Sequence, residues 1–438
     1  MKKRTILYIL IFSLLTACGG RKAATEEQSL ADTVLAEVPY KEEEENLPPE
    51  DLSYAVPENI PGIKTVLCGY EPGEEKYAVF VGRELSGEYA LLDAASGEEI
   101  SRGTLRKRED TEEIFRADLS ELEQEGDYIL YCDEIGYSYP FSVKEGIYEG
   151  WLDAYLDTLN SEETRDAQLT ASILLNLLQV AEFAPERYGT LPSELKGAVE
   201  WLLSLQDESA ASGTEADTDT EILLAVALAR YSDMTAAEDK AFSAQCLKAA
   251  ELTAERLSGK RKDIADSAWY MLNAELLRSS GKDSYRDTLR NLLKNGAPRS
   301  GERVGPVDPV LWGDIAYLSS ERGADRVQCE QIMSEIMSRA QEISRAVRDD
   351  PWLAGGEDPI EILEDAQLLT WVNGIVTNRE YRNAIREKVH YLFGRNPGSA
   401  SFVTERGVIC KEAGNELYYG SVLAVVLSRI DIRYVQVE

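Results

Sequence analysis

Histidine is almost absent from this chain of 438 residues, in which His390 is the only one. Histidine metal clusters and Ser-His-Asp triads both depend on this side chain, so its scarcity argues against either kind of site. A single histidine near the end of a helix is more often a packed or capping residue. We therefore expect His390 to be structural.

Cysteine is also scarce. The six cysteines include no Cys-x-x-Cys pair, which argues against a zinc site or a redox motif. Cys68 and Cys132 are candidates for a disulfide within the N-terminal part of the chain. The alternative is that they, like Cys246, Cys329 and Cys410, are small buried hydrophobic residues. No acidic cluster indicates a calcium site, and we assign neither a metal nor a cofactor.

Positive charge is the third shortage. The chain has 46 Lys and Arg against 79 Asp and Glu, a net charge of −33. A surface of this charge repels nucleic acids and anionic lipid headgroups, which argues against both as ligands. It suits an exported protein that acts on a neutral polymer, although solubility alone also explains it. The length allows two or three domains, and 44% hydrophobic residues are enough for a large core.

The N-terminus reads as an export signal rather than a membrane span. Basic residues at 2–4 precede an apolar run at 6–15 that is too short to cross a bilayer. The sequence Leu-Thr-Ala-Cys at 15–18 resembles the bacterial lipoprotein box, which implies a signal peptide at 1–17, cleavage before Cys18 and a lipid on its sulfur. The alternative is an ordinary secreted protein with an incidental cysteine. With a lipid at Cys18, the protein is expected on the outer side of the cell membrane, held by the anchor alone.

Three regions follow this signal. Residues 18–57 are acidic and poor in large apolar side chains, which predicts a disordered tether. Residues 58–145 contain short alternating runs at 77–81, 89–92, 112–117, 127–132 and 139–143, with turns at 93–97 and 125–126. This spacing predicts a small β-sandwich.

The region 146–438 is predicted to be helical, with about twelve helices joined by loops rich in Gly, Pro and Ser. Their broad apolar faces are typical of helices that pack in two concentric layers. An α-solenoid is the rival architecture. The chain shows no fixed repeat period, which weakens that alternative.

The segment 390–404 is the most informative one in the chain. It contains Tyr-Leu-Phe-Gly-Arg-Asn-Pro and then Ser-Phe-Val-Thr, and Asn-Glu follows at 415–416. Gly394 suits a helix end and Pro397 cannot continue a helix. This pattern resembles the C-terminal signature of glycoside hydrolase family 9, Tyr-Leu-Leu-Gly-x-Asn-Pro-x-x-x-Ser-Tyr-Val-Thr-Gly closed by Asn-Glu.

The resemblance extends over about residues 60–430. The region 58–145 is similar to the immunoglobulin-like domain that precedes many catalytic domains of this family. For 146–438 the resemblance implies an (α/α)6 toroid, so the expected fold is mostly α, with a toroid preceded by a small immunoglobulin-like β-sandwich. It also implies that Glu416 is the catalytic acid. Burial beside Tyr418 and Tyr419 would raise the pKa of Glu416. The simpler alternative is an acidic residue that stabilises a helix N-terminus.

Inverting hydrolysis also needs a second, ionised carboxylate that activates water. The family carries it in Gly-Gly-Trp-x-Asp-Ala-Gly-Asp, before the second helix. Counting back from the second helix without gaps places Glu162 at the position of this base. Asp166 preserves the Asp-Ala pair of the motif, but only if two helical turns are deleted from this chain relative to the family. Asp153 lies in Gly-Trp-Leu-Asp-Ala at 150–154, which matches the Gly-Trp-x-Asp-Ala part of the motif. Its position fits the solvated face of a helix better. The Gly-Asp half of the motif is absent under each alignment.

A second departure lies between Thr404 and Asn415, where the family usually has a long loop with a His-His-Arg group. This chain has only residues 405–414 there, without histidine. Four tryptophans are available as platforms for sugar rings: Trp269, Trp312, Trp352 and Trp371. Each of them also suits a position in the core.

Three functions are consistent with these features. The first is a lipid-anchored hydrolase, similar to family 9 endoglucanases, that cleaves O-glycosidic bonds of a β-glucan-type polysaccharide by inversion. The second is a family 9 fold that has lost turnover and binds glycans or serves in surface assembly. The third is a helical scaffold without a sugar ligand. Polysaccharide or oligosaccharide is the expected partner, and the first function has the most support from the long resemblance.

Overall fold

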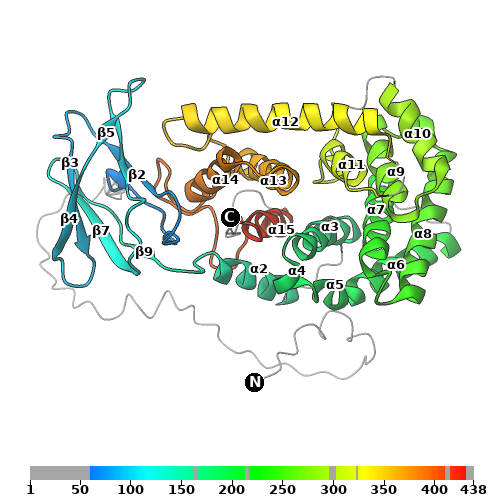
Figure 1. Cartoon of the computed structure of the whole chain (residues 1–438). Helices are drawn as coiled ribbons and strands as arrows, with labels where there is room; N and C mark the ends of the chain where they lie inside the picture. The colour runs from blue at the N-terminus through cyan, green and yellow to red at the C-terminus, as the bar shows by residue number, and fades with distance from the viewer. Residues whose placement is uncertain are drawn as a thin grey trace, which may run out of the picture. The chain divides into compact units, whose positions relative to one another are not determined.

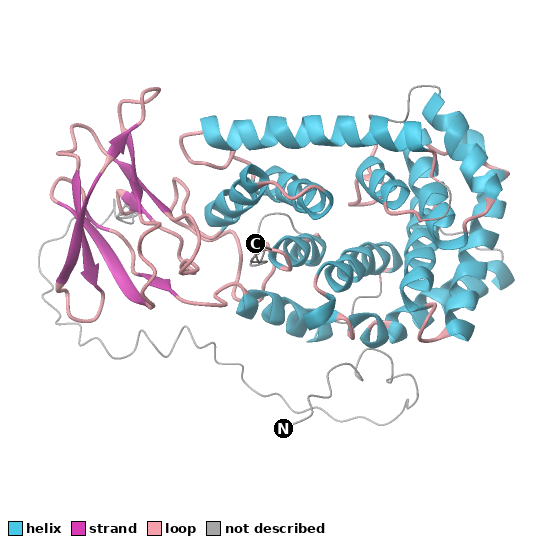
Figure 2. Cartoon of the chain, in the orientation of Figure 1, coloured by secondary structure: helices cyan, strands magenta, loops and turns pink. Residues whose placement is uncertain are grey.

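The computed structural model describes residues 60–161, 166–212, 217–294, 302–321, 324–409 and 415–430. Within these residues, extended strands lie in the region up to Val143 and helices begin at Glu149. Figure 2 shows this division between strands and helices. The signal peptide, the tether and Cys18 lie outside the described residues.

The N-terminal region forms two antiparallel sheets. One has the strand order β1-β2-β6-β5, and the other has the order β4-β3-β7-β8 with β9 paired to β7. The strands are β1 Ile63–Lys64, β2 Tyr77–Val81, β3 Glu88–Asp93, β4 Glu99–Thr104, β5 Arg106–Lys107, β6 Ile114–Asp118, β7 Gly126–Cys132, β8 Gly136–Tyr137 and β9 Phe141–Val143.

Each sheet contributes apolar cross-strand pairs to one core. Phe80 pairs with Phe115 between β2 and β6, and Leu91 pairs with Leu130 between β3 and β7; all four are buried. Such pairs are the main stabilising unit of a sheet. The predicted β-sandwich is confirmed. Sequence reasoning missed β4, because its side chains are almost all exposed and show no alternation.

In the helical region, the described residues include six long helices that are buried mainly along one face. They are α2 Glu149–Ser161, α6 Lys196–Ser212, α8 Lys240–Ser258, α10 Asp283–Lys294, α12 Arg326–Asp349 and α14 Arg379–Leu392. In α12 the buried side chains include Ile332, Ile336, Ile343 and Val347, a spacing of three or four residues that places them on one stripe. These helices form the outer layer.

Six further helices among the described residues are buried on nearly all sides and form the inner layer. They are α3 Ala167–Phe183, α7 Thr218–Thr235, α9 Asp266–Ser280, α11 Pro309–Leu318, α13 Pro359–Ile375 and α15 Glu416–Leu427. In Figure 1, α3, α11, α13 and α15 lie in the interior, between α12 on one side and α2 on the other. The short helices α4 Pro185–Tyr188 and α5 Leu191–Glu194 and the single 3-10 turn Arg261–Asp263 connect longer ones. The toroid of paired helices expected from the sequence is confirmed.

Aspartate caps begin many of these helices, which accounts for part of the acidic composition. In the inner layer, Asp166, Asp217, Asp308 and Asp358 each accept a hydrogen bond from a backbone N–H of the first turn. A cap of this kind contributes about 1 kcal/mol to stability.

The helix end in the signature is explained by a contact with the sandwich. Gly394 has φ of +113°, and a Cβ atom there would lie 2.5 Å from Cγ of Leu67. The backbone N–H of Leu67 donates to the carbonyl of Phe393 at 2.8 Å. A side chain at 394 would therefore be strained and would separate these two segments.

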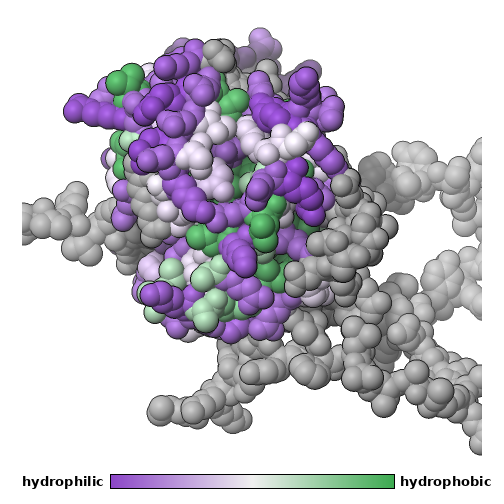
Figure 3. All heavy atoms as spheres, turned by 90° about the vertical axis from the view of Figure 1, so that its right-hand side faces the viewer, coloured by the Kyte–Doolittle hydropathy of each residue, from purple (hydrophilic) through white to green (hydrophobic). Residues whose placement is uncertain are grey.

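The outer surface on the side of α8 and α10 is mostly hydrophilic, with small apolar areas between charged groups (Figure 3). Among the described residues, no single helix is both long and apolar enough to span a membrane. The bent pair Ala167–Phe183 and Pro185–Gln206 has the length and composition of a membrane span, with 112° between its halves, and nothing else indicates one.

Candidate active site

The inner helices begin at one shared end of the helical domain. A buried network fixes their alignment: the side-chain amide of Asn176 donates to Ser421 Oγ at 2.8 Å, and that of Gln367 donates to Asn176 Oδ1 at 3.0 Å. These residues belong to α3, α15 and α13. The network therefore ties together three inner helices that are far apart in the sequence.

Glu416 is the first residue of α15, as the signature predicts, and it is half-buried. It lies five residues before Ser421, or about 7 Å at 1.5 Å of rise per residue. Tyr418 and Tyr419 follow it and are buried, with ring centroids 5.2 Å apart. The side chain of Asn415 makes no capping bond to this helix. Glu416 thus lies half-buried at the start of α15, with two buried tyrosines in the turn that follows.

The three candidates for the catalytic base lie at different positions in the chain, and the two that are described differ in their surroundings. Glu162 lies outside the described residues. Asp166 is the exposed N-cap of α3, where Oδ1 accepts the backbone N–H of Leu169 at 3.0 Å. It lies ten residues before Asn176, or about 15 Å, and is therefore farther out along the barrel than Glu416. Asp153 is on the exposed face of α2, 4.0 Å from Arg187, as expected for a solvated position.

A polar turn crosses this end of the barrel and was missed by sequence reasoning. In the turn around Val304 and Val307, which pair with each other and are buried, Gly305 approaches the side chain of Gln168 at the start of α3. Its backbone also hydrogen-bonds Asp219 at the start of α7. The turn therefore touches the beginnings of two inner helices.

The same turn presents Arg303 to a third inner helix. Arg303 donates to Glu364 Oε2 on α13 at 2.5 Å and to the carbonyl of Pro306 at 2.8 Å. Burial raises the pKa of Glu364 above its usual 4.5 although Arg303 opposes this, and nearby Asp308 and Asp365 add to the increase. Oε1 of Glu364 is buried without a hydrogen-bond partner among the described residues.

This cluster is electrostatically linked to α15. Burial raises the pKa of the Tyr418 phenol, the charge of Glu364 adds to this increase, and Arg303 opposes it. Burial also raises the pKa of Asp219. The end of the barrel thus holds carboxyl groups in two environments, one exposed at Asp166 and one desolvated at Glu364. Arg303 and Glu364 are 61 residues apart, and no local pattern in the sequence connects them.

Three of the four candidate tryptophans are buried core residues: Trp269, Trp312 and Trp371. Trp312 and Trp371 are buried and meet edge to face at 4.6 Å. Burial of both rings excludes them as platforms for a sugar. Trp352 is half-buried, and Trp269 borders a cavity of about 410 Å³ between α8 and α10.

The structural role expected for His390 is confirmed, and the thiols are free. His390 is fully buried, with Nε2 3.0 Å from the hydroxyl of Tyr148 and 3.3 Å from Glu74. Cys68 and Cys132 do not form a disulfide, and Cys132 Sγ donates to Glu134 instead. Cys246 and Cys329 are free as well, and Cys410 lies outside the described residues.

Comparisons with known proteins agree with both domains. A family model described as "Cellulase N-terminal ig-like domain" matches residues 62–137. Endoglucanase D of Acetivibrio thermocellus is 22% identical, over 78% of this chain and 72% of that protein. The chain has the fold and the domain order of glycoside hydrolase family 9.

Solved family 9 structures superpose on most of the chain. A metagenome-derived family 9 endoglucanase matches with a TM-score of 0.70 at 16% identity, covering 84% of this chain and 98% of that one. AaCel9A in complex with cellobiose-like isofagomine has a TM-score of 0.70 at 15% identity, with 84% and 99% covered. A Bacteroides ovatus family 9 protein has a TM-score of 0.66 at 15% identity, with 84% and 98% covered. The family 9 architecture is therefore kept at low identity.

Proposed function

We propose that this protein is a glycoside hydrolase that cleaves a neutral β-linked glucan where the inner helices begin. The observation that carries this proposal is the position of Glu416, which starts α15 half-buried beside buried Tyr418. The relatives called endoglucanases share this architecture. The charge of −33 also fits a neutral rather than an anionic substrate.

In the proposed reaction, Glu416 donates a proton to the leaving glycosidic oxygen. A second carboxylate removes a proton from the water that attacks the opposite face of the sugar, which inverts the anomeric centre. Carboxyl groups in inverting sites stand about 6.5–9.5 Å apart to leave room for this water. Asp166 and Glu162 are the candidates for the second role, and Asp166 is already exposed and oriented by its helix cap.

Replacing the proposed acid tests this function. We expect Glu416→Gln to lower the rate on β-glucans by about 10²–10⁴-fold, the usual contribution of a general acid. Reducing-end assays measure the rate, and proton NMR of the first product identifies its anomer. Glu330→Gln, an exposed substitution on α12, is the matched control and should keep full activity. Equal rates for wild type and Glu416→Gln would remove Glu416 from the mechanism.

A second substitution separates catalysis by Asp166 from its structural role. Asparagine caps helices about as well as aspartate, so Asp166→Asn should leave the thermal stability almost unchanged. If Asp166 is the base, we expect the rate to fall by at least about 10²-fold because the amide cannot accept the proton. Full activity of a stable Asp166→Asn protein would assign the base role to Glu162.

The alternative is a family 9 fold that binds glycans without cutting them. Two observations favour it: the carboxylate of Asp166 is engaged in a helix cap, and the turn around Gly305 lies across the beginnings of α3 and α7. Calorimetry with cello-oligosaccharides distinguishes the two functions. Binding together with absence of reducing ends, for wild type and Glu416→Gln alike, would support the alternative.

The proposed site of action is the outer face of the cell membrane. The support for this is the sequence pattern that ends at Cys18, and no nucleic acid or other membrane contact is proposed. We expect Cys18→Ala to move the protein from the detergent phase to the aqueous phase in a Triton X-114 partition. Partition of wild type into the aqueous phase would contradict the lipid anchor.

A further inference from the structure

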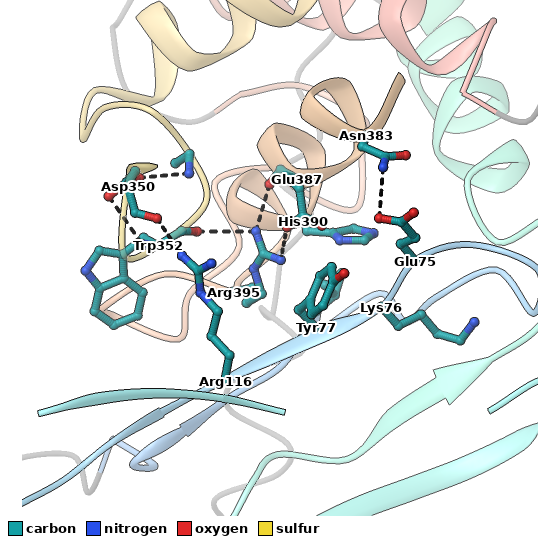
Figure 4. A network of polar contacts seen from close by, with 12 residues as sticks. Glu75, Lys76, Tyr77, Arg116, Asp350, Trp352, Asn383, Glu387, His390 and Arg395 are labelled. Carbon is teal, nitrogen blue, oxygen red and sulfur yellow. Dashed lines mark hydrogen bonds and ion pairs between the residues drawn. The ribbon is translucent and has the colours of Figure 1, made fainter. Parts of the chain in front are cut away.

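A cavity of about 420 Å³ lies where the sandwich meets the helices, away from Glu416. One wall is the edge formed by β2, β5 and β6, and the other is formed by α12, α14 and the segment after α12. Figure 4 shows this region, with Arg116 reaching from the sheet towards Asp350. Domain interfaces are common places for ligand pockets of this size.

The lining is rich in cations for so acidic a chain. Arg106, Lys107, Arg108, Arg116 and Arg348 all border the cavity. Two of its four carboxylates are bound by partners that do not line it: Arg379 pairs with Glu75, and Arg395 pairs with Glu387. Asp118 and Glu380 are the other two. Arg108 and Arg348 likewise have carboxylate partners outside the lining, in Asp110 and Asp349. Arg106, Lys107 and Arg116 therefore face two carboxylates, and the lining keeps a small excess of positive charge.

Arg116 is a half-buried cation whose hydrogen-bond partners in the described part of the chain are backbone carbonyls rather than a carboxylate. It donates to the backbone carbonyls of Asp350 at 2.6 Å and Pro351 at 3.0 Å, and its Nε is buried without a partner among the described residues. Burial lowers the pKa of Arg116 to about 10, and repulsion by Arg108 and Arg395 contributes. Arg108, by contrast, has a carboxylate partner in Asp110 at 2.6 Å.

The rest of the cavity is suited to a sugar ring. Val347, Leu353 and Ala384 provide apolar side chains. Tyr77 and Asn383 add polar groups, and Asn383 Nδ2 already donates one hydrogen bond to Glu75 Oε2 at 2.8 Å. Burial raises the pKa of the Tyr77 phenol to about 12, and the phenol is a hydrogen-bond donor at neutral pH. A volume of about 420 Å³ is far larger than a small inorganic anion requires.

From these features we infer that the cavity is a binding site for a carboxylate-bearing sugar, a uronic acid residue of an oligosaccharide. The carboxylate faces Arg116 and Arg106, because guanidinium groups bind carboxylates through paired, charge-assisted hydrogen bonds. The ring lies against the apolar side chains, with its hydroxyls towards Tyr77 and Asn383. The anion site follows from the cavity alone, and only the choice of a sugar acid rests on the proposed function.

Calorimetry with the full chain tests this site. The probes are trigalacturonate, neutral cellotriose and sodium sulfate, at low and high NaCl. We expect trigalacturonate to bind more tightly than either of the others, with an affinity that falls as salt screens the charges. Arg116→Gln and Arg106→Gln should each weaken trigalacturonate binding about tenfold, the equivalent of one charge-assisted contact.

Two controls keep the test decisive. Arg102→Gln removes an equal charge from β4, outside the cavity, and should bind as wild type does. Arg106 is exposed, so Arg106→Gln still tests the site if Arg116→Gln fails to fold. Hydrolysis of neutral β-glucan, measured on the same samples, should be unchanged in Arg106→Gln. Binding of trigalacturonate without glucan hydrolysis would overturn the proposed function and leave this site standing.

The site is overturned if trigalacturonate does not bind, or if Arg102→Gln weakens its binding as much as Arg106→Gln does. Equal affinity for cellotriose would overturn the role of the carboxylate. Sulfate that binds as tightly as trigalacturonate would overturn the assignment to a sugar.

Discussion

At the scale of single residues, Glu275 is the most unusual ionisable group in the helical domain. It is 1% exposed, and its carboxylate lies 3.6 Å from the guanidinium of Arg230. Arg230 also binds Glu182, so its charge is shared between two carboxylates. Burial raises the pKa of Glu275 from 4.5 to about 7, because the attraction of Arg230 is too weak to offset the lost hydration.

This shift predicts a loss of stability as the pH rises. Between pH 4.5 and about 7 the folded protein keeps a proton on Glu275 that the unfolded chain releases, so the free energy of unfolding falls with rising pH. A neutral Glu275→Gln lacks this dependence. From pH 4 to pH 8, we expect the stability difference to move in favour of the variant by about 3 kcal/mol.

Urea unfolding at several pH values measures this difference. Glu330→Gln, a substitution of an exposed glutamate, should follow the wild-type curve. A constant difference between Glu275→Gln and wild type across this pH range would show that folding does not change the pKa of Glu275, which contradicts the prediction.

Sequence reasoning placed single residues well where a local pattern was present. Glu416 was located by its signature, and His390 was expected to be packed because it stands alone on a helix. The contacts of Arg303 with Glu364 and of Arg116 with Asp350 were not foreseen. Each joins residues on separate elements, and the chain between them carries no signal for the pairing.

At the scale of elements, glycine at 394 connects a helix end to a domain contact. Two costs arise in Gly394→Ala: φ of +113° is strained for alanine, and the new Cβ would overlap Leu67. We expect the free energy of unfolding to fall by about 2–4 kcal/mol. Thermal and urea unfolding measure the loss.

Gly87→Ala is the matched control for this substitution. Gly87 has φ of +88°, and a Cβ there meets nothing within 4 Å, so it reports the backbone strain without the overlap. The difference between the two variants measures the contact with Leu67. Equal losses in both would show that the close approach adds nothing.

The end of α14 was predicted from the sequence, because the Gly394 and Pro397 stop acts within one turn. Strand β4 was missed because both its faces are largely exposed. The buried turn with Val304 and Val307 was not foreseen, since its burial depends on helices from other parts of the chain.

At the scale of the whole molecule, the family 9 signature also joins the two domains. His390 lies against Glu74 and Tyr148, and its ring meets Tyr70 edge to face at 5.2 Å. Lys64 adds a bond to the carbonyl of Pro397 at 2.9 Å. The helix end was recognisable in the sequence, whereas its contacts with the sandwich were not, because the two segments are more than 300 residues apart.

The buried carboxylate of Glu74 makes this junction sensitive to acid. Burial alone disfavours its charge, but His390 and Arg386 outweigh that effect and lower the pKa of Glu74 below 4.5. The stabilisation from the ionised group is therefore present above pH 4.5 and is lost as the pH falls through the lowered pKa. Glu74 is 1% exposed, so removing its charge leaves His390 and Arg386 without their partner.

We expect Glu74→Gln to lower the free energy of unfolding by about 3 kcal/mol at pH 7, the usual cost of breaking a buried pair. This difference from wild type should shrink below pH 4, where wild type also loses the charge. The neighbouring Glu75→Gln removes a partly exposed carboxylate that pairs with Arg379, and it should cost less than about 1 kcal/mol. Urea unfolding at pH 7 and pH 3.5 measures all three proteins. If the loss in Glu74→Gln were the same at both pH values, packing rather than charge would hold this junction together.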